Sequence, residues 1–109
     1  VAGGVVGPAA VEVRSGRIVR VGPRHADPGH PHAVDVGNHA LLPAVVDSHV
    51  HVNEPGRTEW EGFATAGRAA AAGGIGTVVV MPLNCSPVAT TPAALRAEAA
   101  AALGTCMVD

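Results

Sequence analysis

The 109-residue sequence contains no lysine and no tyrosine, and only one phenylalanine and one tryptophan. Its seven basic side chains are all arginine and stand against nine acidic residues, so we expect no basic surface for a nucleic-acid partner. So few large side chains leave little material for an independent hydrophobic core. Together with the start at Val1 and the apolar end "GTCMVD", this predicts a piece of a larger domain.

Long apolar runs and paired cysteine motifs are also missing. Gly, Pro or Arg interrupts every apolar stretch well before the ~20 residues that a membrane span needs. No signal peptide opens the chain. We therefore expect a cytoplasmic protein without a membrane partner. Cys85 and Cys106 lack the spacing of a metal or redox motif, so we interpret both as small buried hydrophobic residues.

The first part of the chain carries β-strand signals. Residues 9–22, "AAVEVRSGRIVRVG", alternate apolar and polar on either side of Ser15-Gly16, which predicts a β-hairpin. A loop rich in Pro, Gly and His follows over 23–33. We expect a short strand over "AVDVG", residues 33–37. Pro43 separates it from a longer apolar strand over 44–52.

From residue 44 onward, apolar strands alternate with helices. Helices are predicted over 61–73, ending at Gly73-Gly74, and over 91–103, where Thr91 is the N-cap. A strand lies between them at "TVVVMP", and "TCMVD" reads as the start of a third. This order predicts an α/β fold with a parallel sheet. A (β/α)8 barrel needs about 250 residues, so most of such a barrel would be missing.

Two histidines stand at the end of the predicted strand over 44–52. On a strand His49 and His51 point the same way, with about 6.6–6.8 Å between their Cα atoms. Imidazoles at that spacing can converge on one divalent ion. Asp47 is expected on the same face, where it can support the ligands from behind. Because barrel enzymes hold their chemistry at this end of a strand, the pattern predicts a metal site.

The histidine pair also has a plainer interpretation, as two polar residues at a strand mouth. A second pair, His30-Pro31-His32, lies in a Pro/Gly loop, and we interpret it as solvated. Two ligands do not complete a catalytic zinc site. Further candidates without convincing geometry are Glu54, Glu59, Glu61 and Asp109, so the remaining ligands are expected beyond the chain.

At these residues a resemblance becomes specific. "LLPAVVDSHVH" resembles the first barrel strand of the cyclic-amidohydrolase branch of the amidohydrolase superfamily, which includes dihydroorotase, hydantoinase and allantoinase. "AVEVRSGRIVRVG" is similar to the small β-sandwich that precedes the barrel. "HVNEPGRTEWEGF" followed by "AAAAGGIGTVVVMPLN" resembles the allantoinase members most. The resemblance implies part of a β-sandwich domain over 1–43 and the first units of a TIM-like (β/α)8 barrel over 44–109.

The same resemblance implies a chemistry. The family holds two metal ions, usually zinc, and His49 and His51 would ligate the more buried one. A carboxylated lysine bridges the ions, and later strands add further ligands. This chain has no lysine and cannot supply the bridge. The implied reaction is hydrolysis of the hydantoin-ring amide of allantoin to allantoate in purine catabolism, by a homo-oligomer that is often a tetramer.

Three residues are candidates for substrate binding. Dihydroorotase-like sequences usually carry an Arg two positions after the second histidine, where it grips a carboxylate. Asn53 stands there instead and suits a ring without a carboxylate, although an Asx-type turn also explains it. Arg57 either contacts substrate or pairs with Glu54 or Glu59. Asn84 either binds substrate or caps its loop.

Some positions depart from the family pattern. The family usually has Gly where Ala44 stands, Thr where Gly76 stands and an acidic residue where Val80 stands. With the missing lysine, these changes keep open a non-catalytic truncated remnant. Within the family, dihydroorotase and hydantoinase or dihydropyrimidinase remain alternatives. Trp60 and Phe63 are interpreted as aromatics that pack a helix.

Overall fold

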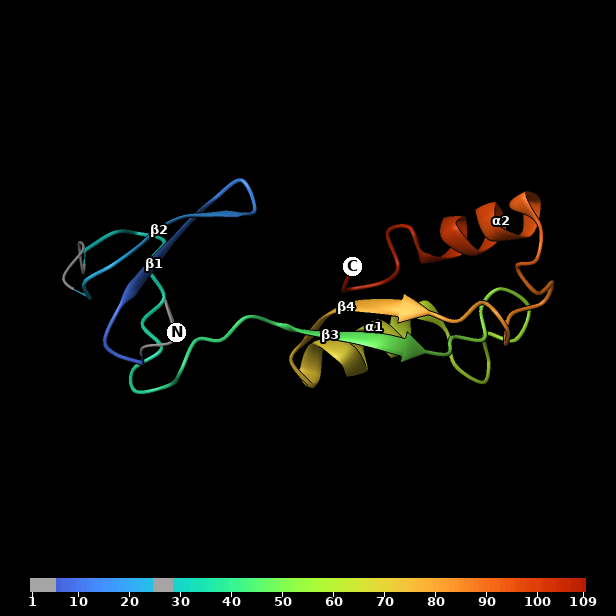
Figure 1. Ribbon diagram of the computed structural model, residues 1–109, viewed down its shortest axis with the longest axis horizontal. Helices are drawn as coiled ribbons and strands as arrows, with labels where there is room; N and C mark the ends of the chain where they lie inside the picture. Colours follow the sequence, from blue (N-terminus) through green and yellow to red (C-terminus); the bar gives the residue numbers. More distant parts are fainter. Residues whose placement is uncertain (1–5, 25–28) are drawn as a thin grey trace. The chain divides into compact units, whose positions relative to one another are not determined.

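The computed structural model describes residues 6–24 and 29–109. The chain divides into two compact units, residues 1–43 and 44–109, each with a two-stranded sheet of its own (Figure 1). The sheet of the first unit is antiparallel, whereas that of the second is parallel. Neither helix in the described part of the chain has the length and apolarity that a membrane span requires.

The first unit contains the predicted hairpin, which is confirmed. β1 (Ala10–Arg14) pairs with β2 (Arg17–Gly22) through a two-residue turn. Both turn residues have positive φ, 48° at Ser15 and 73° at Gly16, as the primed turns that match strand twist require. Val13 and Ile18 are exposed, at 59% and 68%. The hairpin therefore rests on its turn and its ladder of hydrogen bonds rather than on a core.

The strand predicted over 33–37 is wrong, since the structure has no strand at these residues. The side chain of Asp35 accepts a hydrogen bond from the Gly37 N–H at 2.8 Å and lies 3.4 Å from the Arg24 guanidinium. This side chain thus satisfies backbone that a neighbouring strand would otherwise bond. The Gly37 N–H first and Arg24 second hold the pKa of Asp35 below its ordinary value.

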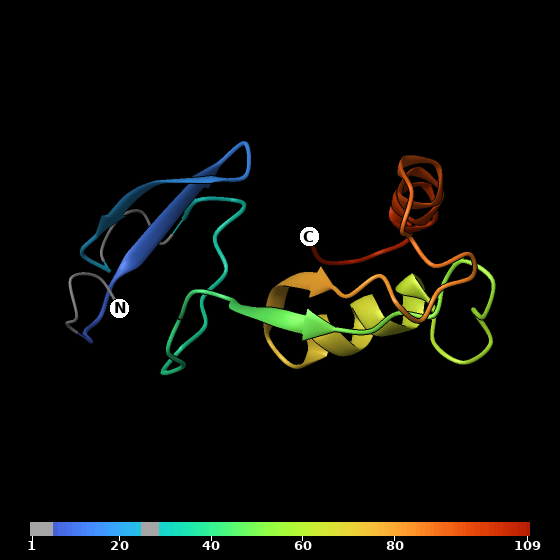
Figure 2. The same ribbon diagram turned by 45° about the vertical axis from the view of Figure 1, so that its right-hand side comes forward.

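The second unit is the start of a parallel α/β sheet. β3 (Val45–Val50) pairs in parallel with β4 (Ile75–Val80), and α1 (Phe63–Ala72) connects them. Figures 1 and 2 show α1 packed along one face of the two strands. Parallel neighbours need such a crossover, so the predicted strand–helix–strand alternation is confirmed.

Both helices begin and end close to the predicted positions. α2 (Pro92–Ala102) starts after Thr91, whose hydroxyl accepts a hydrogen bond from the Ala94 N–H at 3.2 Å. Gly74, after α1, has a φ of 78°, and Gly104, after α2, has a φ of 71°. These glycines adopt the left-handed conformation that commonly follows a helix end.

Residues 105–109, where a third strand is predicted to begin, form no strand, but Asp109 bonds to β4 as a strand residue would. The Asp109 N–H donates to the Gly76 carbonyl at 3.1 Å, and the Asp109 carbonyl accepts from the Val78 N–H at 2.7 Å. This is the hydrogen-bond pattern of a parallel neighbour. Asp109 lies on the opposite side of β4 from β3 (Figures 1 and 2). The chain therefore continues the parallel order β3, β4 and a third position.

Among the described residues, all buried hydrophobic side chains lie in the second unit: Val52, Phe63, Ala70, Cys85 and Ala94. Phe63 supplies the one aromatic of this core and is 4% exposed. Cys85 is 1% exposed, as predicted for a small buried hydrophobe, whereas Cys106 is half-buried. The core is small, as expected from the scarcity of large side chains.

Candidate functional site

The two histidines lie together where β3 ends. His49 is the penultimate residue of β3, and His51 follows its last residue, Val50. Their ring centroids are 5.2 Å apart, with the ring planes at 70°. Both side chains are exposed. The structure therefore presents two imidazoles side by side on one edge of the sheet, as the spacing predicts.

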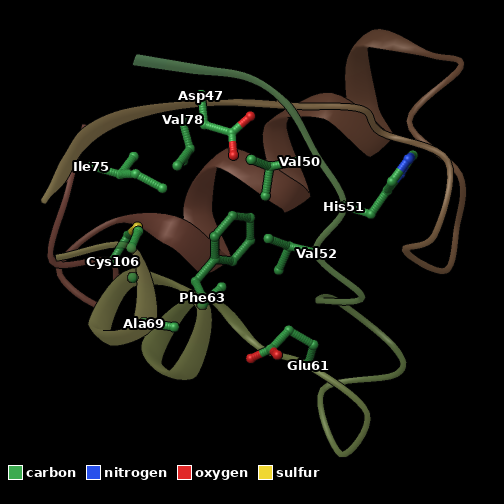
Figure 3. A pocket seen from close by; sticks show the side chains of 13 residues that line it. Asp47, Val50, His51, Val52, Glu61, Phe63, Ala69, Ile75, Val78 and Cys106 are labelled. Carbon is green, nitrogen blue, oxygen red and sulfur yellow. The ribbon is translucent and has the colours of Figure 1, made fainter. Parts of the chain in front are cut away.

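The Asp47 side chain takes a different direction from the ring of His51, although both residues border the same cavity. The pairing of β3 with β4 shifts register between Asp47 and Val50, which interrupts the alternation of side chains. Figure 3 shows Asp47 pointing into this cavity beside Val50, whereas the ring of His51 is directed outward at its rim. The Asp47 carboxylate accepts a hydrogen bond from the backbone N–H of His49 at 3.1 Å. The expectation that Asp47 lies on the face of the imidazoles is therefore wrong, and it contacts main chain rather than a ring.

The cavity itself, of about 310 Å³, lies between α1 and the strands. Phe63, Ala70, Ile75, Val78 and Cys106 give it a mostly apolar lining (Figure 3). Its position under the sheet makes it part of the core of this unit. Asp47, His51 and Glu61 are the acidic and histidine residues that border it, and His51 lies at the carboxyl end of β3.

The loop after β3 is closed by main-chain hydrogen bonds. The Asn53 N–H donates to the Glu61 carbonyl at 2.9 Å, and the Asn53 carbonyl accepts from the Arg57 N–H at 3.0 Å. Within the described residues the Asn53 side-chain amide makes no hydrogen bond. The interpretation of Asn53 as an Asx-type turn residue is therefore wrong. The turn uses the backbone of Asn53 rather than its side chain.

Arg57 forms neither of the expected ion pairs. Its guanidinium lies 5.4 Å from the centre of the Trp60 ring and donates a hydrogen bond to the Asn84 carbonyl at 3.4 Å. Trp60 is 68% exposed and does not pack the helix, so that interpretation is wrong for Trp60 and confirmed for Phe63. The stacking of a cation on an aromatic face explains why Trp60 turns outward.

The loops after β3 and β4 meet. The Ser86 N–H donates to the Pro55 carbonyl at 2.8 Å, and Arg57 reaches Asn84 as described above. Loops 51–62 and 81–91 both leave the carboxyl ends of parallel strands, so they share one edge of the sheet (Figures 1 and 2). The imidazole pair and the candidate substrate residues thus belong to the same edge.

The carboxylates of this region have other partners. The Glu54 carboxylate accepts from the Phe63 N–H at 2.9 Å, and that of Glu61 accepts from the Thr65 hydroxyl. In the part of the chain that the structure describes, no group of three or more His, Cys, Asp or Glu residues is placed to hold a metal ion. Two imidazoles are fewer than the three protein ligands that a catalytic zinc site needs.

Sequence reasoning missed the role of Glu54. It caps the first turn of α1 from nine positions upstream, where its negative charge also favours the helix N-terminus. A Cβ on Gly62 would lie 2.9 Å from this carboxylate and 2.8 Å from the Thr58 methyl group. Gly62, directly before α1, is the feature of the sequence that indicates a close approach of another group to the backbone.

No family model matches the chain. It is 52% identical to an allantoinase of Streptomyces avermitilis over 103 residues, which are 94% of this chain. It is 46% identical to a probable allantoinase of Oryza sativa subsp. japonica over 97% of the chain, and 54% identical to an allantoinase of Saccharomyces cerevisiae over 63%. The chain is related to the allantoinases. It spans 23%, 21% and 15% of the length of these three relatives. The resemblance to allantoinases noted in the sequence therefore extends over nearly all of the chain.

Proposed function

We propose that the chain is the N-terminal part of a metal-dependent cyclic amidohydrolase that hydrolyses the hydantoin-ring amide of allantoin to allantoate. The observation that carries this proposal is the identity with allantoinases over nearly the whole chain. The paired imidazoles at the carboxyl edge of a parallel sheet agree with it, because barrel enzymes place their catalytic groups at this edge.

We propose a TIM-like (β/α)8 barrel as the complete fold. The parallel order of β3, β4 and Asp109, with α1 and α2 between them, fits the first units of such a barrel. The hairpin of β1 and β2, within residues 1–43, fits part of a β-sandwich domain that precedes the barrel. The relatives are about four to five times longer than the chain, which leaves room for the remaining barrel units.

His49 and His51 would hold one of two zinc ions in the complete site. When bound, the metal pair polarises an amide carbonyl and supplies hydroxide at neutral pH. The residues of this chain would bind the metal and orient the substrate. Asp47 holds the His49 backbone, while the Asn53 amide offers a neutral donor and acceptor to a ring amide. The bridging lysine must come from outside these 109 residues, since the chain has none.

Three alternatives to allantoin hydrolysis differ in what they require. A dihydroorotase must bind a substrate carboxylate, for which Asn53 offers no positive charge. A hydantoinase or dihydropyrimidinase acts on a neutral ring, as an allantoinase does. Only a comparison of substrates distinguishes these activities. A non-catalytic remnant is the interpretation that the missing lysine favours for the chain by itself.

The test is expression of the complete reading frame that contains these residues. We expect zinc-dependent hydrolysis of allantoin, lost on chelation, with weaker turnover of dihydroorotate, hydantoin and dihydrouracil. The 109-residue chain alone should hydrolyse none of them, because most metal ligands are absent. A complete protein that binds zinc and prefers dihydroorotate would contradict the proposal, as would a reading frame that stops at Asp109.

A further inference from the structure

Gly56 lies where the two loops approach most closely. Its φ is +91°, a conformation that side-chain-bearing residues rarely adopt. A Cβ built on Gly56 would lie 2.3 Å from the carbonyl oxygen of Ser86 and 2.8 Å from the Ser86 Cβ. The nearest obstacle is main chain, which cannot swing aside as the end of a long side chain can. No residue larger than glycine fits without moving one loop.

Two hydrogen bonds flank this contact. On one side the Ser86 N–H donates to the Pro55 carbonyl at 2.8 Å, and on the other Arg57 donates to the Asn84 carbonyl at 3.4 Å. The three contacts fall on consecutive residues of the first loop. They therefore act as one junction, defined here as residues 55–57 against residues 84–86.

Each loop is also held by a contact just outside the junction. The first loop is tied to α1 where Glu54 accepts from the Phe63 N–H at 2.9 Å. The second loop begins where the Met81 N–H donates to the Val50 carbonyl of β3 at 2.7 Å. Cys85, inside the junction, is 1% exposed, so this part of the second loop is packed. Movement at residue 56 must therefore pass into the segment that carries Asn84.

We propose that Gly56 is a positioning residue, which sets the place of Asn84 relative to the histidine-bearing end of β3. This rests on the proposed function, in which Asn84 contacts substrate. A methyl group at residue 56 displaces the Ser86 carbonyl, two residues from Asn84, whereas His49 lies within β3 and His51 directly follows it, five residues before Gly56. Substrate binding should therefore weaken while the metal ligands keep their places.

The experiment compares Gly56→Ala with Gly104→Ala in the complete protein. Gly104 has a similar φ of +71° but open space around its Cβ position, so it carries the same backbone cost without the collision. We expect Gly56→Ala to raise the KM for allantoin about tenfold or more, since small misplacements in a site cost up to about a hundredfold. Zinc content per chain should equal that of wild type, and Gly104→Ala should leave KM unchanged.

Two further variants keep the test decisive. Arg57→Ala removes one contact of the junction without a collision, and we expect it to raise KM a few-fold with zinc retained, even if Gly56→Ala fails to fold. Adding Ser86→Ala to Gly56→Ala should restore nothing, because the main-chain oxygen remains. Equal KM values for Gly56→Ala and Gly104→Ala, loss of zinc in Gly56→Ala, or rescue by Ser86→Ala would each overturn the proposal.

Failure of the proposed function gives a different result. If the wild-type protein does not hydrolyse allantoin, the junction is tested by hydrogen exchange at the Ser86 amide. We expect faster exchange in Gly56→Ala than in Gly104→Ala, because the bond to the Pro55 carbonyl is weakened. Unchanged exchange would reject the junction itself.

Discussion

The molecule contains two His-x-His pairs with nearly the same ring geometry. The rings of His30 and His32 lie 5.7 Å apart at 59°, and those of His49 and His51 lie 5.2 Å apart at 70°. In the first pair the His30 Nδ1 accepts a hydrogen bond from the His32 N–H at 3.2 Å, within a loop. The second pair stands at the end of a paired strand beside two packed loops. Ring spacing alone therefore does not distinguish the two pairs, whereas the strand that carries His49 does.

The two units differ in the same way. All buried side chains of the described residues lie in 44–109, whereas the large apolar residues of the hairpin are exposed. The first unit depends on turn geometry, and the second depends on contacts between segments far apart in the sequence. The following predictions test that contrast.

The largest effect is expected from the core aromatic. Phe63→Ala should reduce the free energy of unfolding of the second unit by about 3–5 kcal/mol, because Phe63 is 4% exposed. The side chain of Ile18 in the hairpin is 68% exposed. Ile18→Ala should therefore change the free energy of unfolding of the first unit by about 0.5 kcal/mol or less. Urea unfolding followed by fluorescence and circular dichroism measures both. Similar losses from the two changes would contradict the contrast.

The next effect concerns a pair of small residues where the sheet begins. A Cβ on Gly76 would lie 2.6 Å from the Cβ of Ala44. Gly76→Thr should therefore cost about 1–3 kcal/mol by overpacking. Adding Ala44→Gly removes the obstructing atom and should recover most of the loss. We therefore expect the substitutions at these two positions to compensate each other. Additive losses in a double-mutant cycle would exclude this coupling.

A smaller effect depends on pH. Glu98 is 6% exposed, and within the described residues its buried carboxylate oxygen has no hydrogen-bond partner. Burial raises the pKa of Glu98 above its ordinary value. Its stability contribution is fully present at acidic pH, below the unfolded pKa, and is lost as the pH rises through the folded pKa. Glu98→Gln should remove this loss and stabilise the chain at pH 7 by about 1 kcal/mol.

Thermal melts between pH 4 and pH 8 measure this effect. Glu59→Gln is the matched control, because Glu59 is an exposed glutamate of the same unit. The control should follow the wild-type pH profile. A Glu98→Gln profile that falls with pH as steeply as wild type would show that another group is responsible.

The smallest effect is expected in the hairpin turn. Ser15 has a φ of 48°, which asparagine tolerates better than serine, and Asn-Gly is the preferred pair for such turns. Ser15→Asn should slow hydrogen exchange across β1 and β2, with a gain of about 0.5 kcal/mol. The second unit should be unaffected. Faster exchange in the hairpin would contradict the turn geometry.

Features set by local sequence could be predicted. The hairpin turn at Ser15-Gly16, the N-cap at Thr91 and the glycines after both helices depend on a few neighbouring residues. The parallel order also follows from the alternation of apolar strands with helices. The expected proximity of the two imidazoles came from their spacing of two residues, and their ring centroids lie 5.2 Å apart.

Features that depend on distant partners could not be predicted. Asp47 turns to the α1 side because β3 shifts register against β4, which no local pattern in β3 encodes. Arg57 pairs with Trp60 and the Asn84 carbonyl instead of a nearby glutamate because the loop after β4 packs there. Glu54 reaches the helix N-terminus through a loop whose path was not visible in the sequence.

Metal content of the complete protein tests the central claim most directly, with each histidine pair disrupted in turn. His49→Ala and His51→Ala should each lower zinc per chain and allantoin hydrolysis together, whereas His30→Ala and His32→Ala should leave both at the wild-type level. Full zinc stoichiometry in either His49→Ala or His51→Ala, or an equal loss from the first pair, would contradict the assignment of the strand end as the metal site.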